Sequence, residues 1–134
     1  NALQKFRGHQ VILTNASRCW AERALHYIGA DSVFKSEEII PIEDVNFVPK
    51  ARDRDGFNHA LKVLNLKPYD VLMVDDLHRN LVIPHEMGMQ TIYINHGQPI
   101  EEMPDHITDQ SKNLVTLIDQ FYRPNDLFIA TSQT

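Results

Sequence analysis

Two adjacent carboxylates, Asp75 and Asp76, directly follow the apolar run at residues 71–74. In open α/β sheets ligands gather at the carboxyl ends of strands, so both side chains are expected to point into one crevice. At about 4 Å and a protein-like dielectric, two such charges repel each other by about 4 kcal/mol. A hard divalent cation removes this repulsion, and magnesium prefers carboxylate oxygen and water. The pair therefore predicts a magnesium site; the alternative is a solvated acidic turn that caps the next helix.

Two further positions have residue types suited to an anion. Thr14 and Asn15 end one predicted strand and open a helix, where a hydroxyl and free backbone N–H groups form an anion site. The alternative is simple N-capping by Asn15. Lys50 lies just before the helix that starts near Asp53 and could reach a phosphate as a point charge; the alternative is an exposed loop lysine. The seven histidines show no metal-ligand spacing, and His78, close to the acid pair, is interpreted as structural or exposed.

The elements that must position these residues follow from hydrophobic periodicity. Four apolar runs rich in β-branched residues predict strands buried on both faces, at residues 11–13, 38–40, 71–74 and 91–94. Amphipathic spacing predicts helices over residues 16–30, 54–65 and 112–122. The first helix has Trp20, Ala24, Tyr27 and Ile28 on one side, and Ser111 is the expected N-cap of the third.

Alternating strands and helices predict an α/β fold with a three-layer, Rossmann-like parallel sheet and helices on both faces. Residues 95–109 are expected to form a loop. The chain is divided into a core over residues 1–122 and a tail over residues 123–134, which is either a frayed end or an extra strand.

The composition bounds the function. The chain has 134 residues, 43% of them apolar, which favours one folded domain. A net charge of −5 argues against a nucleic-acid partner. No apolar run reaches the roughly 18 residues of a membrane span and no signal peptide opens the chain, so we expect a cytoplasmic protein. Cys19 is the only cysteine, which excludes an internal disulfide.

Read in chain order, these residues resemble a known family. The stretches VILTNAS, VPKARDRDGFNHAL and VLMVDDLHRNLVIPHEMGMQTIYI resemble the second, third and fourth motifs of the haloacid dehalogenase (HAD) superfamily, most closely its pyrimidine 5′-nucleotidase-like branch. In the last stretch the acid pair Asp75-Asp76 is followed by Asn80 and by Gly88-Met89. The resemblance covers roughly residues 8 to 95 and implies that Asn80 supports the loop after the acid pair.

The resemblance also implies a role for each of the other residues. Thr14 would hydrogen-bond the substrate phosphate, with Asn15 beside it. Lys50 would neutralise the phosphate and the attacking carboxylate. Asp75 would bind Mg²⁺, with Asp76 adjacent or acting through water. The implied activity is magnesium-dependent hydrolysis of a small phosphate monoester, such as a nucleoside 5′-monophosphate.

The chain departs from the family pattern in several places. The family's first motif, Asp-x-Asp-x-Thr, supplies the nucleophile and the general acid/base, yet residues 1–13 contain no aspartate and the first one is Asp31. The proline that usually follows the motif-three lysine is Ala51 here. Pro84 should shorten or kink the helix after the acid pair. The substrate-selecting cap is absent, except for a stub at residues 1–6.

In the family fold the missing strand lies between the strands that end at Thr14 and Asp75, which would leave two unpaired edges. We expect upstream polypeptide, a strand donated by a partner or second copy, or the tail to fill this gap. In the tail, Ala130, Ser132 and Thr134 repeat the spacing of the lost motif. We therefore expect truncation or strand donation, and a chain that is inactive alone. The alternative is a non-catalytic HAD-like module that binds phosphate or a protein. A phosphoacceptor signalling domain is disfavoured by the motif order.

Overall fold

The computed structural model describes residues 9–45, 48–120 and 127–130. The strands are β1 (Gln10–Leu13), β2 (Ile39–Ile40), β3 (Val71–Asp75), β4 (Gln90–Ile94), β5 (Asp109–Ser111) and β6 (Leu127–Ala130). The α-helices are α2 (Arg18–Tyr27), α3 (Asp55–Leu64), α4 (Val82–Met87) and α5 (Leu114–Gln120). Short 3₁₀ helices span Ser36–Glu38, Ile42–Val45, Pro68–Asp70 and His78–Leu81.

The six strands form one sheet in the order β2-β1-β6-β3-β4-β5, and every neighbouring pair is parallel. The predicted α/β class with a parallel sheet is therefore confirmed. Parallel strands need crossover connections, and most of these contain helices that cover the faces of the sheet.

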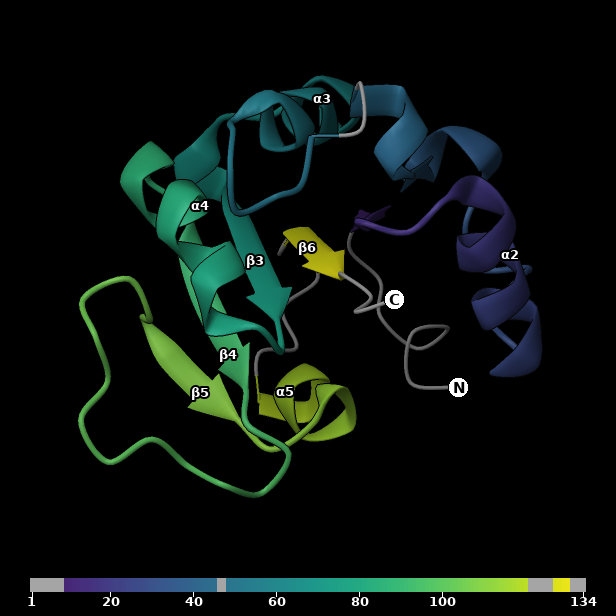
Figure 1. The fold of residues 1–134 in the computed structure, drawn as a ribbon. Helices are drawn as coiled ribbons and strands as arrows, with labels where there is room; N and C mark the ends of the chain where they lie inside the picture. The colour runs from purple at the N-terminus through teal and green to yellow at the C-terminus, as the bar shows by residue number, and fades with distance from the viewer. Residues whose placement is uncertain (1–8, 46–47, 121–126, 131–134) are drawn as a thin grey trace.

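The centre of the sheet, which the resemblance leaves without a strand, is occupied by β6. This strand lies between β1 and β3 (Figure 1, yellow), with Ala130 opposite Ile12 on one side and Val74 on the other. The tail therefore supplies the strand that pairs both edges. Ser132 and Thr134, which complete the spacing noted in the tail, lie outside the described residues. The division into a core and a tail stays a prediction.

Alternating side chains divide the core into two clusters, one on each face of the sheet. One cluster packs β1 and β3 against α3 and α4, through Val11, Leu13, Met73, Phe57 and Ile83. The other packs the same strands against α2 and α5, through Ile12, Val74, Leu25 and Leu117. The sheet is thus the middle layer of three, as expected.

The predicted apolar side of the first helix is wrong. Trp20, Tyr27 and Ile28 are 59%, 91% and 60% exposed, whereas Ala21 and Leu25 are buried. The helix is also shorter than the expected residues 16–30, because it begins at Arg18 and ends at Tyr27.

The start of the last helix also differs from the expectation. Asn113, not Ser111, caps α5, because its side-chain oxygen accepts the backbone N–H of Thr116 at 2.8 Å. Ser111 instead ends β5, a three-residue edge strand that begins at the last residue of the predicted loop. Pro84 is the third residue of the short helix α4, where its missing N–H costs no helical hydrogen bond. Within the described part of the chain, no helix is long and apolar enough to cross a membrane.

Candidate functional site

Lys50 links the carboxyl ends of the two strands that flank β6. Its ammonium donates to the carbonyl oxygen of Leu13 at 3.2 Å and to Asp75 Oδ2 at 3.0 Å. Its backbone N–H donates to Asn15 Oδ1 at 2.9 Å. The Lys50 side chain is only 2% exposed, which excludes the exposed-loop interpretation. A buried cation therefore sits where β1 and β3 end.

Asp75 is held by three donors. Its Oδ2 accepts from Lys50 and from Asn80 Nδ2 at 3.1 Å, and its Oδ1 accepts the backbone N–H of Leu77 at 2.9 Å. Burial lowers the pKa of the Lys50 ammonium, and the charge and hydrogen bond of Asp75 oppose that fall. The pairing keeps two buried charges compensated, as buried charges must be.

Thr14 and Asn15 lie next to this pair, in roles that differ from capping. Thr14 is buried, and its Oγ1 accepts the backbone N–H of Ala16 at 3.0 Å. Ser17 caps α2, so N-capping by Asn15 is wrong. The Asn15 carboxamide instead fixes the backbone of Lys50. A single hydrogen-bonded chain thus runs from Asn15 through Lys50 and Asp75 to Asn80.

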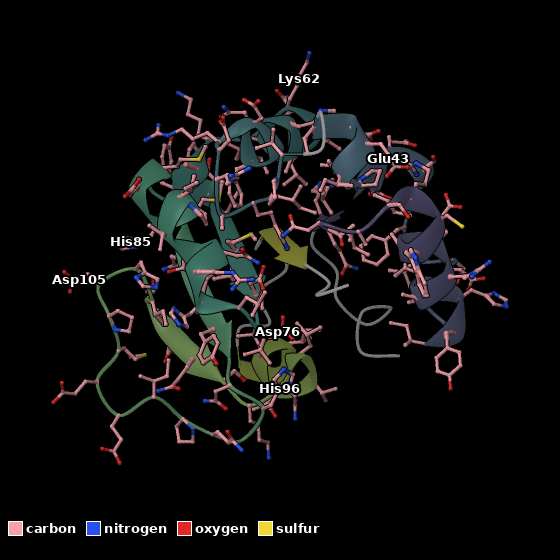
Figure 2. The ribbon with its side chains drawn as sticks, in the orientation of Figure 1. Glu43, Lys62, Asp76, His85, His96 and Asp105 are labelled. Atoms are coloured by element: carbon pink, nitrogen blue, oxygen red, sulfur yellow. The ribbon has the colours of Figure 1, made fainter. Side chains whose placement is uncertain are left out.

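Asp76 turns to a different partner from its neighbour. Its Oδ2 lies 3.1 Å from Nε2 of His96, and Figure 2 shows these two side chains together beside α5. The other oxygen, Oδ1, is buried and has no hydrogen-bond partner among the residues that the structure describes. The two carboxylates are therefore adjacent in sequence but have different partners: Asp75 contacts Lys50 and Asn80, whereas Asp76 contacts His96.

His96 is a site residue that the sequence analysis did not identify. It follows β4 with a φ of 55°, a left-handed backbone conformation that is uncommon outside glycine. Such strain persists where surrounding structure imposes it and often occurs at functional sites. The sequence does contain one indication of this role. His96 lies just beyond the carboxyl end of β4, which neighbours β3, and a glycine, Gly97, follows it.

A cavity of about 320 Å³ opens at the carboxyl ends of β3 and β4 and the start of α5. Asp75, Asp76 and His96 line it, whereas Thr14, Asn15, Lys50 and Asn80 do not. The predicted site residues are thus brought to one edge of the sheet, but only the acid pair reaches this cavity.

The donor set suits a magnesium ion with few protein ligands. The described residues contain no group of three or more His, Cys, Asp or Glu side chains placed to hold a metal. Magnesium is commonly held by one or two carboxylates, with water and substrate phosphate completing the shell. The unpartnered, buried Oδ1 of Asp76 fits that role better than Asp75, three of whose acceptor positions are filled.

Two curated proteins that are similar to this chain carry the same name. Pyrophosphatase PpaX of Bacillus mycoides (strain KBAB4) is 26% identical over 122 residues, which are 87% of this chain and 55% of the relative. Pyrophosphatase PpaX of Bacillus cereus (strain ATCC 10987 / NRS 248) is 27% identical over 125 residues, which are 89% and 56%. The chain thus spans about half the length of the curated relatives it matches.

A solved crystal structure of a dehalogenase shares the fold. It aligns with a TM-score of 0.70 and 21% identity, over 84% of this chain and 49% of the other. The family model of the haloacid dehalogenase-like hydrolases matches residues 1–81. Because this match covers more than half of the sequence, the chain belongs to the haloacid dehalogenase-like hydrolase family.

Proposed function

We propose that this chain provides the phosphate- and magnesium-binding part of a phosphatase that hydrolyses phosphate monoesters. The observation that carries the proposal is the buried Lys50 ammonium, held between the Leu13 carbonyl oxygen and the Asp75 carboxylate. A lysine in this position supplies a fixed positive charge for a phosphoryl group. In this proposal Thr14 and Asn15 lie beside the phosphate.

The local charge supports a requirement for a cation. Lys50 contributes one positive charge and Asp75 and Asp76 contribute two negative charges, so these three side chains carry a net charge of −1. A phosphate dianion next to this group would be repelled. One Mg²⁺ on Asp76 reverses the sign of the net charge and would polarise the phosphoryl oxygen when bound. We therefore propose Mg²⁺ as the cofactor.

Two phosphate compounds are candidate substrates for the full-length protein. The resemblance to the pyrimidine 5′-nucleotidase-like branch favours nucleoside 5′-monophosphates, and the relatives named pyrophosphatases make pyrophosphate the second candidate. Both should be tested for phosphate release with the full-length gene product, with Mg²⁺ and with a chelator. Magnesium-dependent release from a nucleoside 5′-monophosphate supports the proposal, whereas release from pyrophosphate alone, or from neither substrate, refutes the monoester activity.

A binding measurement on this chain tests the proposed metal ligand. Asp76→Asn should weaken Mg²⁺ binding in the presence of inorganic phosphate by at least about tenfold, because a neutral amide replaces the carboxylate that is proposed to bind the ion. Asp105→Asn removes an exposed carboxylate elsewhere and is the matched control. Equal affinity in the two variants, measured by titration calorimetry, would contradict the role of Asp76.

A non-catalytic phosphate-binding module is the second candidate. The described part of the central strand reads Leu127-Phe128-Ile129-Ala130 and offers no nucleophile. Phosphate binding by this chain, combined with no release by the full-length product, would favour this function over hydrolysis.

A further inference from the structure

The cavity beside the acid pair has two chemically different walls. Asp75 and Asp76 form the acidic wall, and four aliphatic side chains form the apolar wall: Val74, Ile94, Leu114 and Val115. His96 and Asn113 complete the lining. Its volume of about 320 Å³ falls in the range of about 300–1,000 Å³ that is typical of small-molecule sites. The cavity is therefore large enough for a ring or a short chain, and it reaches the acid pair of the proposed magnesium site.

We propose that this cavity binds the organic group of a phosphorylated substrate, an uncharged and mainly apolar group such as an aromatic ring. The inference rests on the proposed function, because the phosphate would lie at the Asp75 end. An apolar wall gains free energy by covering an apolar group and loses it by desolvating a charged one.

The same wall argues against pyrophosphate as the preferred substrate. The second phosphate of pyrophosphate is charged and would have to enter a space lined by aliphatic side chains and by the Asp76 carboxylate. It would meet no lysine or arginine there, because the polar side chains that line the cavity in the described part of the chain are Asp75, Asp76, His96 and Asn113. The cavity therefore selects esters with an organic group over anhydrides of phosphate.

His96 defines the polar rim of the cavity. Its ring is exposed, and its contact with Asp76 Oδ2 ties the end of β4 to the end of β3. The second oxygen of this carboxylate, Asp76 Oδ1, is buried and has no hydrogen-bond partner among the described residues. In this arrangement a bound organic group would cover the acid pair and shield it from solvent.

The inference is tested by calorimetric titration of this chain with three ligands in excess MgCl₂: inorganic phosphate, methyl phosphate and phenyl phosphate. Methyl phosphate should bind like inorganic phosphate, because a methyl group covers little of the wall. Phenyl phosphate should bind on the order of tenfold more tightly, because part of its ring becomes buried. Pyrophosphate should bind less tightly than phenyl phosphate.

A pair of variants tests whether the cavity causes the difference. Val115→Trp adds bulk at the cavity wall and should abolish the preference for phenyl phosphate while inorganic phosphate still binds. Ile28→Trp makes a comparable change at the end of α2, outside the cavity, and should keep the preference. Val115 and Ile28 are matched in exposure, at 56% and 60%.

The outcomes separate the two proposals. If inorganic phosphate does not bind, the proposed function fails and the cavity assignment fails with it. If inorganic phosphate binds but phenyl phosphate binds no more tightly, the cavity assignment alone is overturned. It is also overturned if Val115→Trp and Ile28→Trp show the same ligand preference.

Discussion

We expect the contributions of Lys50 and Asp75 to the free energy of unfolding to be strongly coupled, because the two side chains form a buried ion pair. Lys50→Met removes an ammonium that donates to Leu13 and Asp75, and it leaves the Asp75 carboxylate with two neutral donors, from Leu77 and Asn80. Removing one partner of a buried pair costs about 3–5 kcal/mol, because the other charge stays buried without compensation. Asp75→Asn should cost a similar amount, since it leaves the Lys50 ammonium without its carboxylate.

The double variant decides whether this reasoning is correct. If each single change costs about 4 kcal/mol, independent sites would lose about 8 kcal/mol together. Because the double variant contains no uncompensated charge, we expect a loss nearer 5 kcal/mol and a coupling energy of about 3 kcal/mol. Urea unfolding at neutral pH gives all three free energies, provided that the slope with denaturant is unchanged.

An exposed lysine provides the control for this cycle. Lys62→Met changes a solvent-facing side chain of α3 and should alter the free energy of unfolding by less than about 0.5 kcal/mol. A coupling energy below about 0.5 kcal/mol, or a Lys50→Met loss no larger than that of Lys62→Met, would refute the buried-pair interpretation.

Three smaller predictions concern positions around the site. Thr14→Val keeps the shape of the side chain but leaves the Ala16 N–H without its acceptor, so it should cost about 1–3 kcal/mol in thermal or urea unfolding. Gly88→Ala forces a Cβ onto a residue with a φ of 101° and should cost about 1–2 kcal/mol by the same measurement. Burial, and then the charge of His78, lowers the pKa of His106 from its usual value of 6.5. The unfolded chain therefore binds a proton at this histidine more readily than the folded chain. The free energy of unfolding should fall as the pH is lowered from 6.5 through the folded-state pKa. An NMR titration should show the pKa of His106 rising in His78→Gln; an unchanged value would contradict the contact.

The site residues could be found from the sequence because some follow a distinctive strand and the others lie in recognisable motifs. The run that ends at Asp75 is continuous and apolar, which is typical of a strand buried on both faces, and β3 is fully buried. Asn15, Lys50 and Asn80 were identified by their place in the motifs, and the structure joins all three to Asp75 directly or through Lys50. Their roles toward phosphate and metal stay predictions.

The features that were missed lack a local pattern. β5 reads Asp-Gln-Ser and pairs only at the edge of the sheet, so no apolar alternation marks it. The contact of His96 with Asp76 depends on a left-handed turn after β4, which sequence spacing does not encode for a histidine. The exposed side of α2 was misassigned because periodicity gives a face but not which face meets the sheet. The larger side chains, such as Trp20, lie outside.

The central position of β6 has a consequence for how the chain folds as it is synthesised. More than a hundred residues separate Leu13 at the end of β1 from Leu127 at the start of β6. Among the described strands, β6 is the one that pairs the inner edges of both halves of the sheet, β2-β1 and β3-β4-β5. Contacts between such distant segments form slowly, and unpaired strand edges expose the nascent chain to aggregation. Pairing of β6 with β1 should therefore be a late step in the folding of this sheet, after the locally connected strands β3 and β4 have paired.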